Sequence, residues 1–240
     1  MNSEHLEYNR DTNPYPSFGK KYNSERAIIS LTSWKARINT VSKTIYSLIK
    51  QCPGFHIVLV LSEEEFPKMM DELPENLKLF VDNELIELMF VFKNYRSFKK
   101  VLFTMDKYRD VPVISADDDC IYTCNYAQEL YDRSKQINEK IITFARSGCG
   151  QYFTQGPCTL YKTNALNDYL NDCFNEMNKR TDFSQDDSYY HQFLLKRKIL
   201  VGWVHNDRFH LPYKFHTTVG AINPSQYSNP WARIALNWSK

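Results

Sequence analysis

The chain of 240 residues is long enough for one domain with a complete hydrophobic core, and its 42% hydrophobic and 24% charged residues are typical of a globular protein. Lys and Arg total 30 and Asp and Glu total 28, a balance that argues against a nucleic-acid-binding protein, which is usually far more basic. Residues 1–25 are polar, and the longest apolar runs are too short to cross a bilayer. We therefore expect a cytoplasmic protein, with peripheral contact to the inner face of the membrane left open.

The distribution of apolar residues along the chain predicts an alternation of strands and helices. Continuous apolar runs predict strands over residues 27–31, 56–61, 87–92, 111–116, 140–145 and 200–204. Apolar residues at helical spacing predict helices over residues 41–49, 66–73 and 98–108, and others that begin after Asn125, near Asn164 and near Ser184. Such an alternation is typical of an α/β sheet of mostly parallel strands flanked by helices, which binds ligands at the carboxyl ends of its strands.

Polar segments that contain prolines flank this alternating region. We predict an irregular N-terminal arm over residues 1–25, a single domain over residues 26–213 and a tail over residues 214–240. The tail contains Pro224 and Pro230 together with several aromatic residues, so we expect it to pack on the domain, on the side of the active site.

The strand predicted over residues 111–116 runs directly into Asp117, Asp118 and Asp119. In an extended chain, alternate side chains point to opposite sides, so Asp117 and Asp119 are predicted to share a side and Asp118 to face away. Crowded carboxylates repel each other, and Mg²⁺ or Mn²⁺ relieves that repulsion by binding one or two carboxylates together with substrate phosphates. The alternative is a loop of solvated aspartates or a cap of the following helix, which a position at the end of a core strand makes less attractive.

Four further segments accompany the triplet in chain order, at residues 30–38 (SLTSWKARI), 97–100 (SFKK), 156–161 (GPCTLY) and 185–187 (QDD). With the triplet as a DxD motif, they resemble segments of GT-A-type bacterial glycosyltransferases over about residues 26–205. The resemblance implies a GT-A-like (Rossmann-like), mostly parallel sheet in a single domain. It also implies a metal-dependent, hexosyltransferase-like enzyme, which moves a sugar from a nucleotide-diphosphate donor, a UDP-sugar, to a glycan or lipid-linked acceptor in polysaccharide or lipopolysaccharide biosynthesis. Transfer with inversion is preferred over retention because Asp186 and Asp187 offer a carboxylate base. The DDxSxD segment of many members is absent, which leaves the nucleotide base open.

The resemblance further assigns roles to individual residues. It implies that the nucleotide is bound by Thr32, Ser33, Arg37, Lys100, Asp117 and Asp118. It implies that Mn²⁺ or Mg²⁺ is bound by Asp119 and Asp117, with a histidine from the C-terminal region, for which His216 is preferred over His205 and His210. It implies that the catalytic base is Asp187, with Asp186 as the next candidate. Some of these residues have simpler readings: Arg37 as a surface arginine, Asp186 and Asp187 as first-turn acids of a helix, and Lys99, beside Lys100, as a solvated lysine.

Two other functions fit parts of the sequence. A nucleotidyltransferase on a related α/β sheet usually carries a glycine-rich signature near its first strand, and residues 31–38 contain no glycine. A non-catalytic carbohydrate-binding or calcium-binding module would use the aromatic and acidic residues, but such a module rarely needs a sheet covered on both faces. Glycosyl transfer therefore ranks first among the three.

Overall fold

The computed structural model describes residues 15–23, 25–51, 53–144, 158–166, 170–179, 186–204 and 213–215. The strands are β1 (Ser17–Gly19), β2 (Ala27–Thr32), β3 (Phe55–Ser62), β4 (Glu87–Val91), β5 (Val113–Asp117), β6 (Cys120–Tyr122), β7 (Ile141–Phe144), β8 (Thr159–Tyr161), β9 (Val201–Val204) and β10 (Tyr213–Phe215). The helices are α1 (Val41–Ile49), α2 (Glu75–Asp82), α3 (Lys99–Lys107), α4 (Tyr126–Gln136), α5 (Leu170–Lys179) and α6 (Asp186–Lys196), with the 3₁₀ turns η1 (Met69–Glu72) and η2 (Arg96–Phe98).

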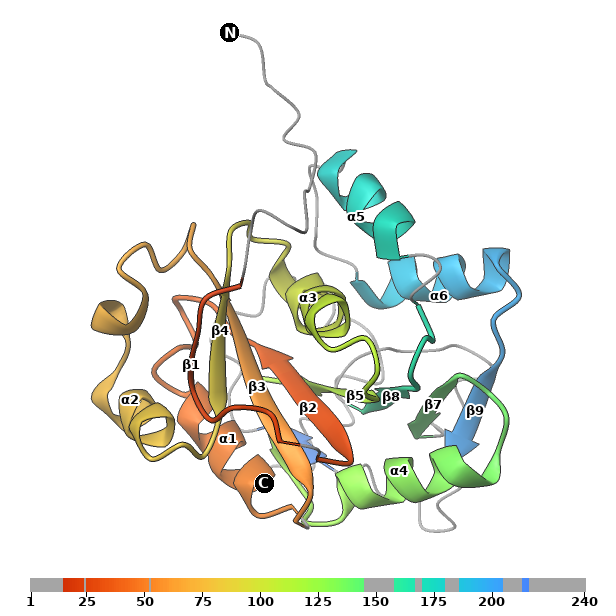
Figure 1. The fold of residues 1–240 in the computed structure, drawn as a ribbon, viewed down its shortest axis with the longest axis horizontal. Helices are drawn as coiled ribbons and strands as arrows, with labels where there is room; N and C mark the ends of the chain where they lie inside the picture. Colours follow the sequence, from red (N-terminus) through yellow and green to blue (C-terminus); the bar gives the residue numbers. More distant parts are fainter. Residues whose placement is uncertain are drawn as a thin grey trace, which may run out of the picture.

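The main sheet has the strand order β1-β4-β3-β2-β5-β8-β7-β9 (Figure 1). Strand β6 pairs separately with β10. The pairs β2–β3, β3–β4, β2–β5 and β7–β9 are parallel, whereas β1 and β8 run antiparallel to their neighbours. The predicted single α/β domain, with a mostly parallel sheet flanked by helices, is confirmed. The chain runs outward from β2 to β3 and β4 and then returns to the other side of β2, so the topological switch point lies between β2 and β5.

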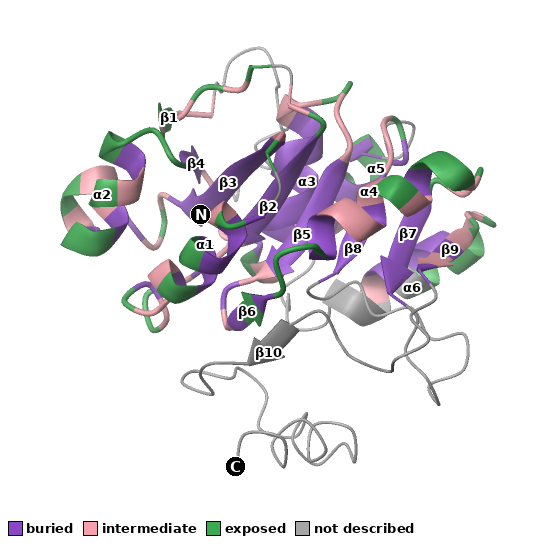
Figure 2. Cartoon of the chain, turned by 90° about the horizontal axis from the view of Figure 1, so that it is seen from below, coloured by how far each residue is buried: buried purple, intermediate pink, exposed green. Residues whose placement is uncertain are grey.

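Side chains of the central strands alternate between two hydrophobic cores, one on each face of the sheet. On one face, Ile29 and Leu59 belong to the core that α1, α2 and α4 complete, and on the other, Ile28 and Val58 belong to the core of α3, α5 and α6. All four side chains are fully buried, and Figure 2 shows the central strands as a continuous buried layer. Cover on both faces explains why these strands read as nearly unbroken apolar runs. Among the described residues, no helix is both long enough and apolar enough to cross a bilayer.

Two helices differ from their predicted positions because single residues adopt left-handed backbone conformations. Met69 has a φ of 49°, so the segment predicted as a helix over residues 66–73 forms only the short turn η1, and a regular helix, α2, follows Pro74. Asn164 has a φ of 61°, so the helix predicted to begin near it does not start there, and α5 begins at Leu170.

The N-terminal arm predicted to be irregular over residues 1–25 contains a strand, β1, which extends the sheet beyond β4. Its last residue, Gly19, has a φ of +82°. A Cβ atom there would lie 2.5 Å from the carbonyl oxygen of Ile86 and 2.9 Å from that of Val81. The prediction missed β1 because a three-residue edge strand has too few residues to show a pattern and is defined by its partner.

We expect Gly19→Ala to lower the free energy of unfolding by about 1–3 kcal/mol, because it combines an unfavourable φ with a clash against backbone atoms that cannot move alone. Urea denaturation followed by circular dichroism measures the change. A midpoint equal to that of the wild type would show that β1 shifts without cost and is not held where the structure has it.

A buried polar cluster joins this N-terminal segment to the amino ends of β3 and β4. The Glu87 carboxylate, 2% exposed as a residue, lies 2.7 Å from His56 Nε2 and accepts hydrogen bonds from Lys107 Nζ at 2.6 Å and from the Tyr108 hydroxyl at 2.5 Å. Burial alone would raise the pKa of Glu87, but these three partners outweigh it and hold the pKa at about 2. Lys107 also donates to Ser17 Oγ at 2.9 Å, which ties β1 to the cluster.

Candidate active site

The acidic triplet lies at the topological switch point of the sheet. Strand β5 ends at Asp117, whose register partner is Thr32, the last residue of β2. Residues 118 and 119 form a turn, and β6 starts immediately after it. Because β2 and β5 are parallel, the loop after β2 and the acidic turn leave the sheet at the same edge. In open α/β sheets, this crevice is where ligands bind.

Asp118 is the most enclosed of the three aspartates, with 7% of its side chain exposed. Ser33 Oγ donates to its Oδ2 at 2.6 Å, and Arg37 Nη1 donates to its Oδ1 at 2.7 Å. Thr44 Oγ1, from α1, donates to the backbone carbonyl oxygen of Asp118 at 2.9 Å. Protein donors thus hold Asp118, and it fastens the acidic turn to the loop that follows β2.

The two other aspartates are more exposed and contact different basic residues. Asp117, with 28% of its side chain exposed, accepts a hydrogen bond from Lys100 Nζ on α3. Asp119, with 15% of its side chain exposed, lies 3.0 Å from Arg37 Nη1, so it shares this guanidinium with Asp118. The prediction for the triplet assumed an extended chain, whereas residues 118 and 119 form a turn. Arg37 joins Asp118 to Asp119, so Asp118 is not set apart from Asp119 in its contacts. That Asp117 and Asp119 share a side stays a prediction.

The adjacent lysines at the start of α3 are both buried, at 1% exposed for Lys99 and 2% for Lys100. The expectation that Lys99 is solvated is wrong, since its ammonium donates to Asn94 Oδ1 at 2.6 Å and to Glu65 Oε2 at 3.3 Å. Burial lowers the pKa of Lys99, against the opposing effect of Glu65. The two ammonium groups therefore have different partners. Lys100 contacts the acidic triplet, and Lys99 joins α3 to the segments that follow β3 and β4.

The acidic turn is electrostatically crowded. Burial, followed by the charges of Asp117 and Asp118, raises the pKa of Asp119 to about 6, and Arg37 opposes this rise. The Cys120 thiol lies 3.5 Å from Asp119 Oδ1 as a hydrogen-bond donor, and burial raises the pKa of that thiol well above its usual value. The Asp119 carboxyl therefore loses its proton less readily than an ordinary aspartate does.

The structure brings together seven of the residues predicted for the site. They are Thr32, Ser33, Arg37, Lys100, Asp117, Asp118 and Asp119. The Thr32 hydroxyl donates to the carbonyl oxygen of Val60 at 2.6 Å, and that of Ser33 donates to Asp118, so both hydroxyls have protein acceptors. A contact of either with a nucleotide stays a prediction.

The remaining predicted residues are placed only in part. His216, His205 and His210 lie outside the described residues, although Phe215, which precedes His216, is the register partner of Cys120, next to Asp119. Asp186 and Asp187 are the first two residues of α6, and their side chains lie outside the described part of the structure. Among the described residues, no three His, Cys, Asp or Glu side chains are grouped as a metal site.

Two supporting residues were missed by sequence reasoning. Thr44 holds the carbonyl of Asp118, and Ser30 Oγ donates to the carbonyl oxygen of Lys100 at 2.5 Å while lying 2.8 Å from Thr104 Oγ1. Both are fully buried. The sequence does contain a signal for Ser30, because it is a polar residue within the apolar run of β2.

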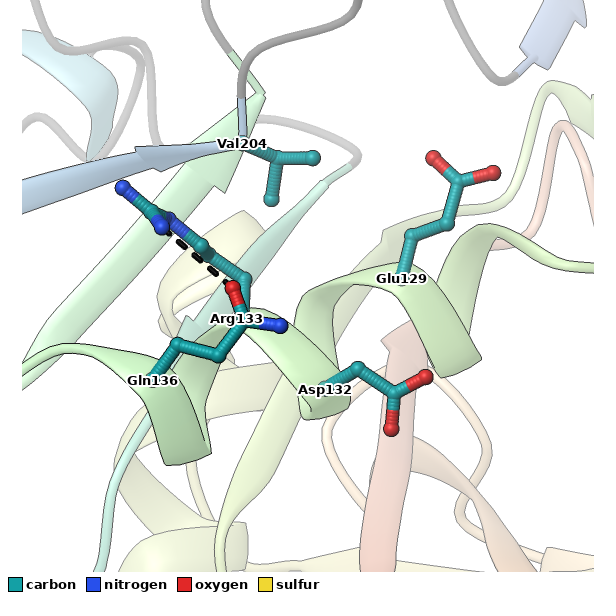
Figure 3. Close-up of a pocket in the computed structure, with 5 residues that line it drawn as sticks. All are labelled: Glu129, Asp132, Arg133, Gln136 and Val204. Atoms are coloured by element: carbon teal, nitrogen blue, oxygen red, sulfur yellow. Dashed lines mark hydrogen bonds between the residues drawn. The ribbon is translucent and has the colours of Figure 1, made fainter.

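A separate pocket lies between α4 and the end of β9 and contains none of the predicted residues (Figure 3). It is lined by Glu129, Asp132, Arg133, Gln136 and Val204. Arg133 Nε donates to the carbonyl oxygen of Trp203 at 2.9 Å and its Nη1 to Gln136 Oε1 at 3.3 Å, so the guanidinium is engaged in holding β9 to α4. We therefore place the candidate active site at the acidic turn.

No protein-family model and no curated protein match the chain. Several solved structures are similar to it at low identity. The crystal structure of TarS of S. aureus, residues 1–349 in complex with UDP, is 12% identical with a TM-score of 0.44, over 60% of this chain and 48% of that chain. A further crystal structure of TarS residues 1–349 is 12% identical with a TM-score of 0.44, over 72% of this chain and 64% of that chain. The glycosyltransferase GlyE of Streptococcus pneumoniae TIGR4 is 14% identical with a TM-score of 0.42, over 90% and 63%. The match spans less than two thirds of the length of each of these structures.

Proposed function

We propose that this protein is a glycosyltransferase that moves a sugar from a nucleotide-diphosphate donor, a UDP-sugar, to a glycan or lipid-linked acceptor with the help of Mn²⁺ or Mg²⁺. The observation that carries the proposal is the acidic turn at the switch point between β2 and β5, with Lys100 and Arg37 beside it. Carboxylates and fixed cations at the carboxyl edge of such a sheet suit a substrate that is a polyanion bound with a metal.

The donor set at the turn fits a hard divalent cation. Asp117 and Asp119 supply carboxylate oxygens, are more exposed than Asp118, and would be the protein ligands, with His216 as the proposed additional one. Mg²⁺ commonly uses one or two carboxylates and completes its shell with substrate phosphates and water, so a site without three grouped protein ligands is compatible with it. When bound, such an ion neutralises charge on the departing diphosphate.

The chain's own residues provide the rest of the donor site. We propose that the Lys100 ammonium, a compact charge, binds a phosphate oxygen of the donor. The planar guanidinium of Arg37 donates hydrogen bonds to the phosphate or to the acidic turn. We propose that Thr32, the last residue of β2, and Ser33, which follows it, contact the ribose or the base of the donor. Asp118 joins the segment after β2 to the acidic turn through Ser33 and Arg37. Uracil is our proposal for the base, and the comparison of UDP with GDP and CMP described below tests it.

For transfer with inversion, the acceptor's hydroxyl oxygen forms a bond to the anomeric carbon while the bond from that carbon to the diphosphate breaks. The hydroxyl proton passes to a carboxylate, for which we propose Asp187, with Asp186 as the next candidate. The packing of α6 supports this assignment. Tyr189 and Tyr190, one turn further along α6, contact the ring of Phe98 at centroid distances of 5.4 Å each, immediately before the lysines of α3.

Calorimetric titration of the wild type with UDP, with and without Mn²⁺, tests the proposed function. We expect binding that requires Mn²⁺, since the acidic turn repels a diphosphate unless a divalent cation is present. GDP and CMP serve as controls for the base. If none of the three nucleotides binds, with or without Mn²⁺, the proposal is wrong; release of pyrophosphate from a nucleoside triphosphate and a sugar phosphate would instead indicate a nucleotidyltransferase.

A further inference from the structure

Each carboxylate of the acidic turn is already in contact with a basic group of the protein. Lys100 contacts Asp117, and Arg37 contacts both Asp118 and Asp119. Only 3% of the Lys100 side chain and 14% of the Arg37 side chain are exposed, so these are enclosed ion pairs rather than surface ones. The two cations approach from different elements, Lys100 from α3 and Arg37 from the loop before α1.

These contacts compete with a divalent cation for the same oxygen atoms. An incoming Mn²⁺ would have to share Asp117 with the Lys100 ammonium, at a distance where two positive charges repel strongly. If Lys100 left Asp117 without another anion, a buried charge would lose its partner, which is costly. A diphosphate supplies that anion, because lysine binds phosphate oxygens as a point charge.

Hydrogen bonds hold the backbone around Lys100 in place, so its ammonium group can move from Asp117 to a phosphate without movement of the backbone. Ser30 Oγ donates to the carbonyl oxygen of Lys100, and the neighbouring Lys99 anchors the same turn of α3 through Asn94 and Glu65. An exchange of partners by Lys100 is therefore a movement of its four-carbon side chain over a short range and needs no shift of the helix.

We infer that Lys100, together with Arg37, is an internal counter-ion of the acidic turn that changes partner on donor binding, from carboxylate to diphosphate. The inference rests on the proposed function and adds to it a specific linkage. The metal and the nucleotide bind cooperatively. The diphosphate draws the Lys100 ammonium away from the carboxylate that the metal binds, and the metal neutralises the carboxylates that repel the diphosphate. Lys100 consequently opposes binding of the metal alone and favours binding of the nucleotide.

The test is Mn²⁺ binding, measured from the electron paramagnetic resonance signal of free Mn²⁺, to the wild type and to Lys100→Met. We expect Lys100→Met to bind Mn²⁺ alone about tenfold more tightly and to bind UDP, at saturating Mn²⁺, about tenfold more weakly. Lys99→Met is the matched control, since Lys99 is the adjacent residue, is equally buried and contacts other partners; its affinity for Mn²⁺ should change by at most about twofold. Lys100→Gln gives the same readout if the methionine variant does not fold.

The outcomes separate the inference from the proposed function. If the wild type binds UDP with Mn²⁺ but loss of the Lys100 charge leaves Mn²⁺ affinity unchanged or weaker, or if Lys99→Met tightens it equally, Lys100 is no counter-ion and the inference is overturned while the proposed function stands. If the wild type binds neither Mn²⁺ nor any of the nucleotides UDP, GDP and CMP, both are overturned. Tighter metal binding together with weaker nucleotide binding in one variant is the pattern that a merely structural lysine would not produce.

Discussion

Replacement of Asp119 by Asn is expected to abolish Mn²⁺-dependent nucleotide binding, with a loss of at least about 100-fold in affinity, because a metal-bound carboxylate contributes several kcal/mol. Asp117→Asn should have a similar effect. Both substitutions keep the size of the side chain and remove its charge. Calorimetry with UDP and Mn²⁺ measures the loss, and turnover of a UDP-sugar should fall at least as far.

Asp132→Asn is the matched control for these variants. Asp132 is an exposed aspartate of α4 that accepts a hydrogen bond from Gln128 at 2.7 Å, away from the acidic turn. It should bind UDP and Mn²⁺ as the wild type does. Undiminished binding by both Asp117→Asn and Asp119→Asn, in a wild type that requires Mn²⁺, would move the metal site elsewhere in the chain.

Replacement of Glu87 by Gln is expected to lower the unfolding free energy at pH 7 by about 3–4 kcal/mol, because a pKa lowered from 4.5 to about 2 contributes about 1.4 kcal/mol for each pKa unit. Because the folded-state pKa of Glu87 is lowered to about 2, its contribution is complete above the unfolded-state pKa, near 4.5, and is lost as the pH falls toward 2. The difference between wild type and variant should therefore shrink over that range. Urea denaturation at several pH values between 3 and 7 measures it.

The exposed residue Glu84 provides the comparison for this prediction. Glu84→Gln makes the same chemical change at the surface and should alter stability by no more than about 0.5 kcal/mol. If Glu87→Gln is as stable as the wild type at pH 7, the hydrogen bonds of His56, Lys107 and Tyr108 do not outweigh the burial of the carboxylate, and the assigned direction of the pKa shift is wrong.

The position of the candidate site was predictable because its residues lie at the ends of apolar runs. The run before Asp117 and the run before Ser33 both had to be buried strands, and parallel strands bring their carboxyl ends to one edge. What the sequence does not contain is the order of the strands. That β2 and β5 are neighbours, with Thr32 beside Asp117, follows from contacts between segments far apart in the chain, which the pattern within each segment does not indicate.

The contacts within the site were less predictable than its position. Lysines are rarely buried, so composition favoured a solvated Lys99, and only the burial of the start of α3 against Glu65 and Asn94 reverses that expectation. The partners of Arg37 depend on the turn at residues 118 and 119, which a pattern of three acids does not encode. Strands β6 and β8, three residues each, are likewise defined by their partners and not by their own sequence.

The pairing of β6 with β10 has a consequence for the order in which the protein folds. Tyr122 pairs with Tyr213, and these residues are far apart along the chain, whereas β2, β3 and β4 follow one another closely. Contacts between distant segments form late, because closing a long loop costs entropy before the contact repays it. We therefore expect the strand directly after the acidic triplet to gain its partner only when synthesis has reached the C-terminal region and the main sheet has formed. Pulsed hydrogen exchange during refolding should protect the amides of β3 before those of β6, and simultaneous protection would show that the small sheet assembles with the large one.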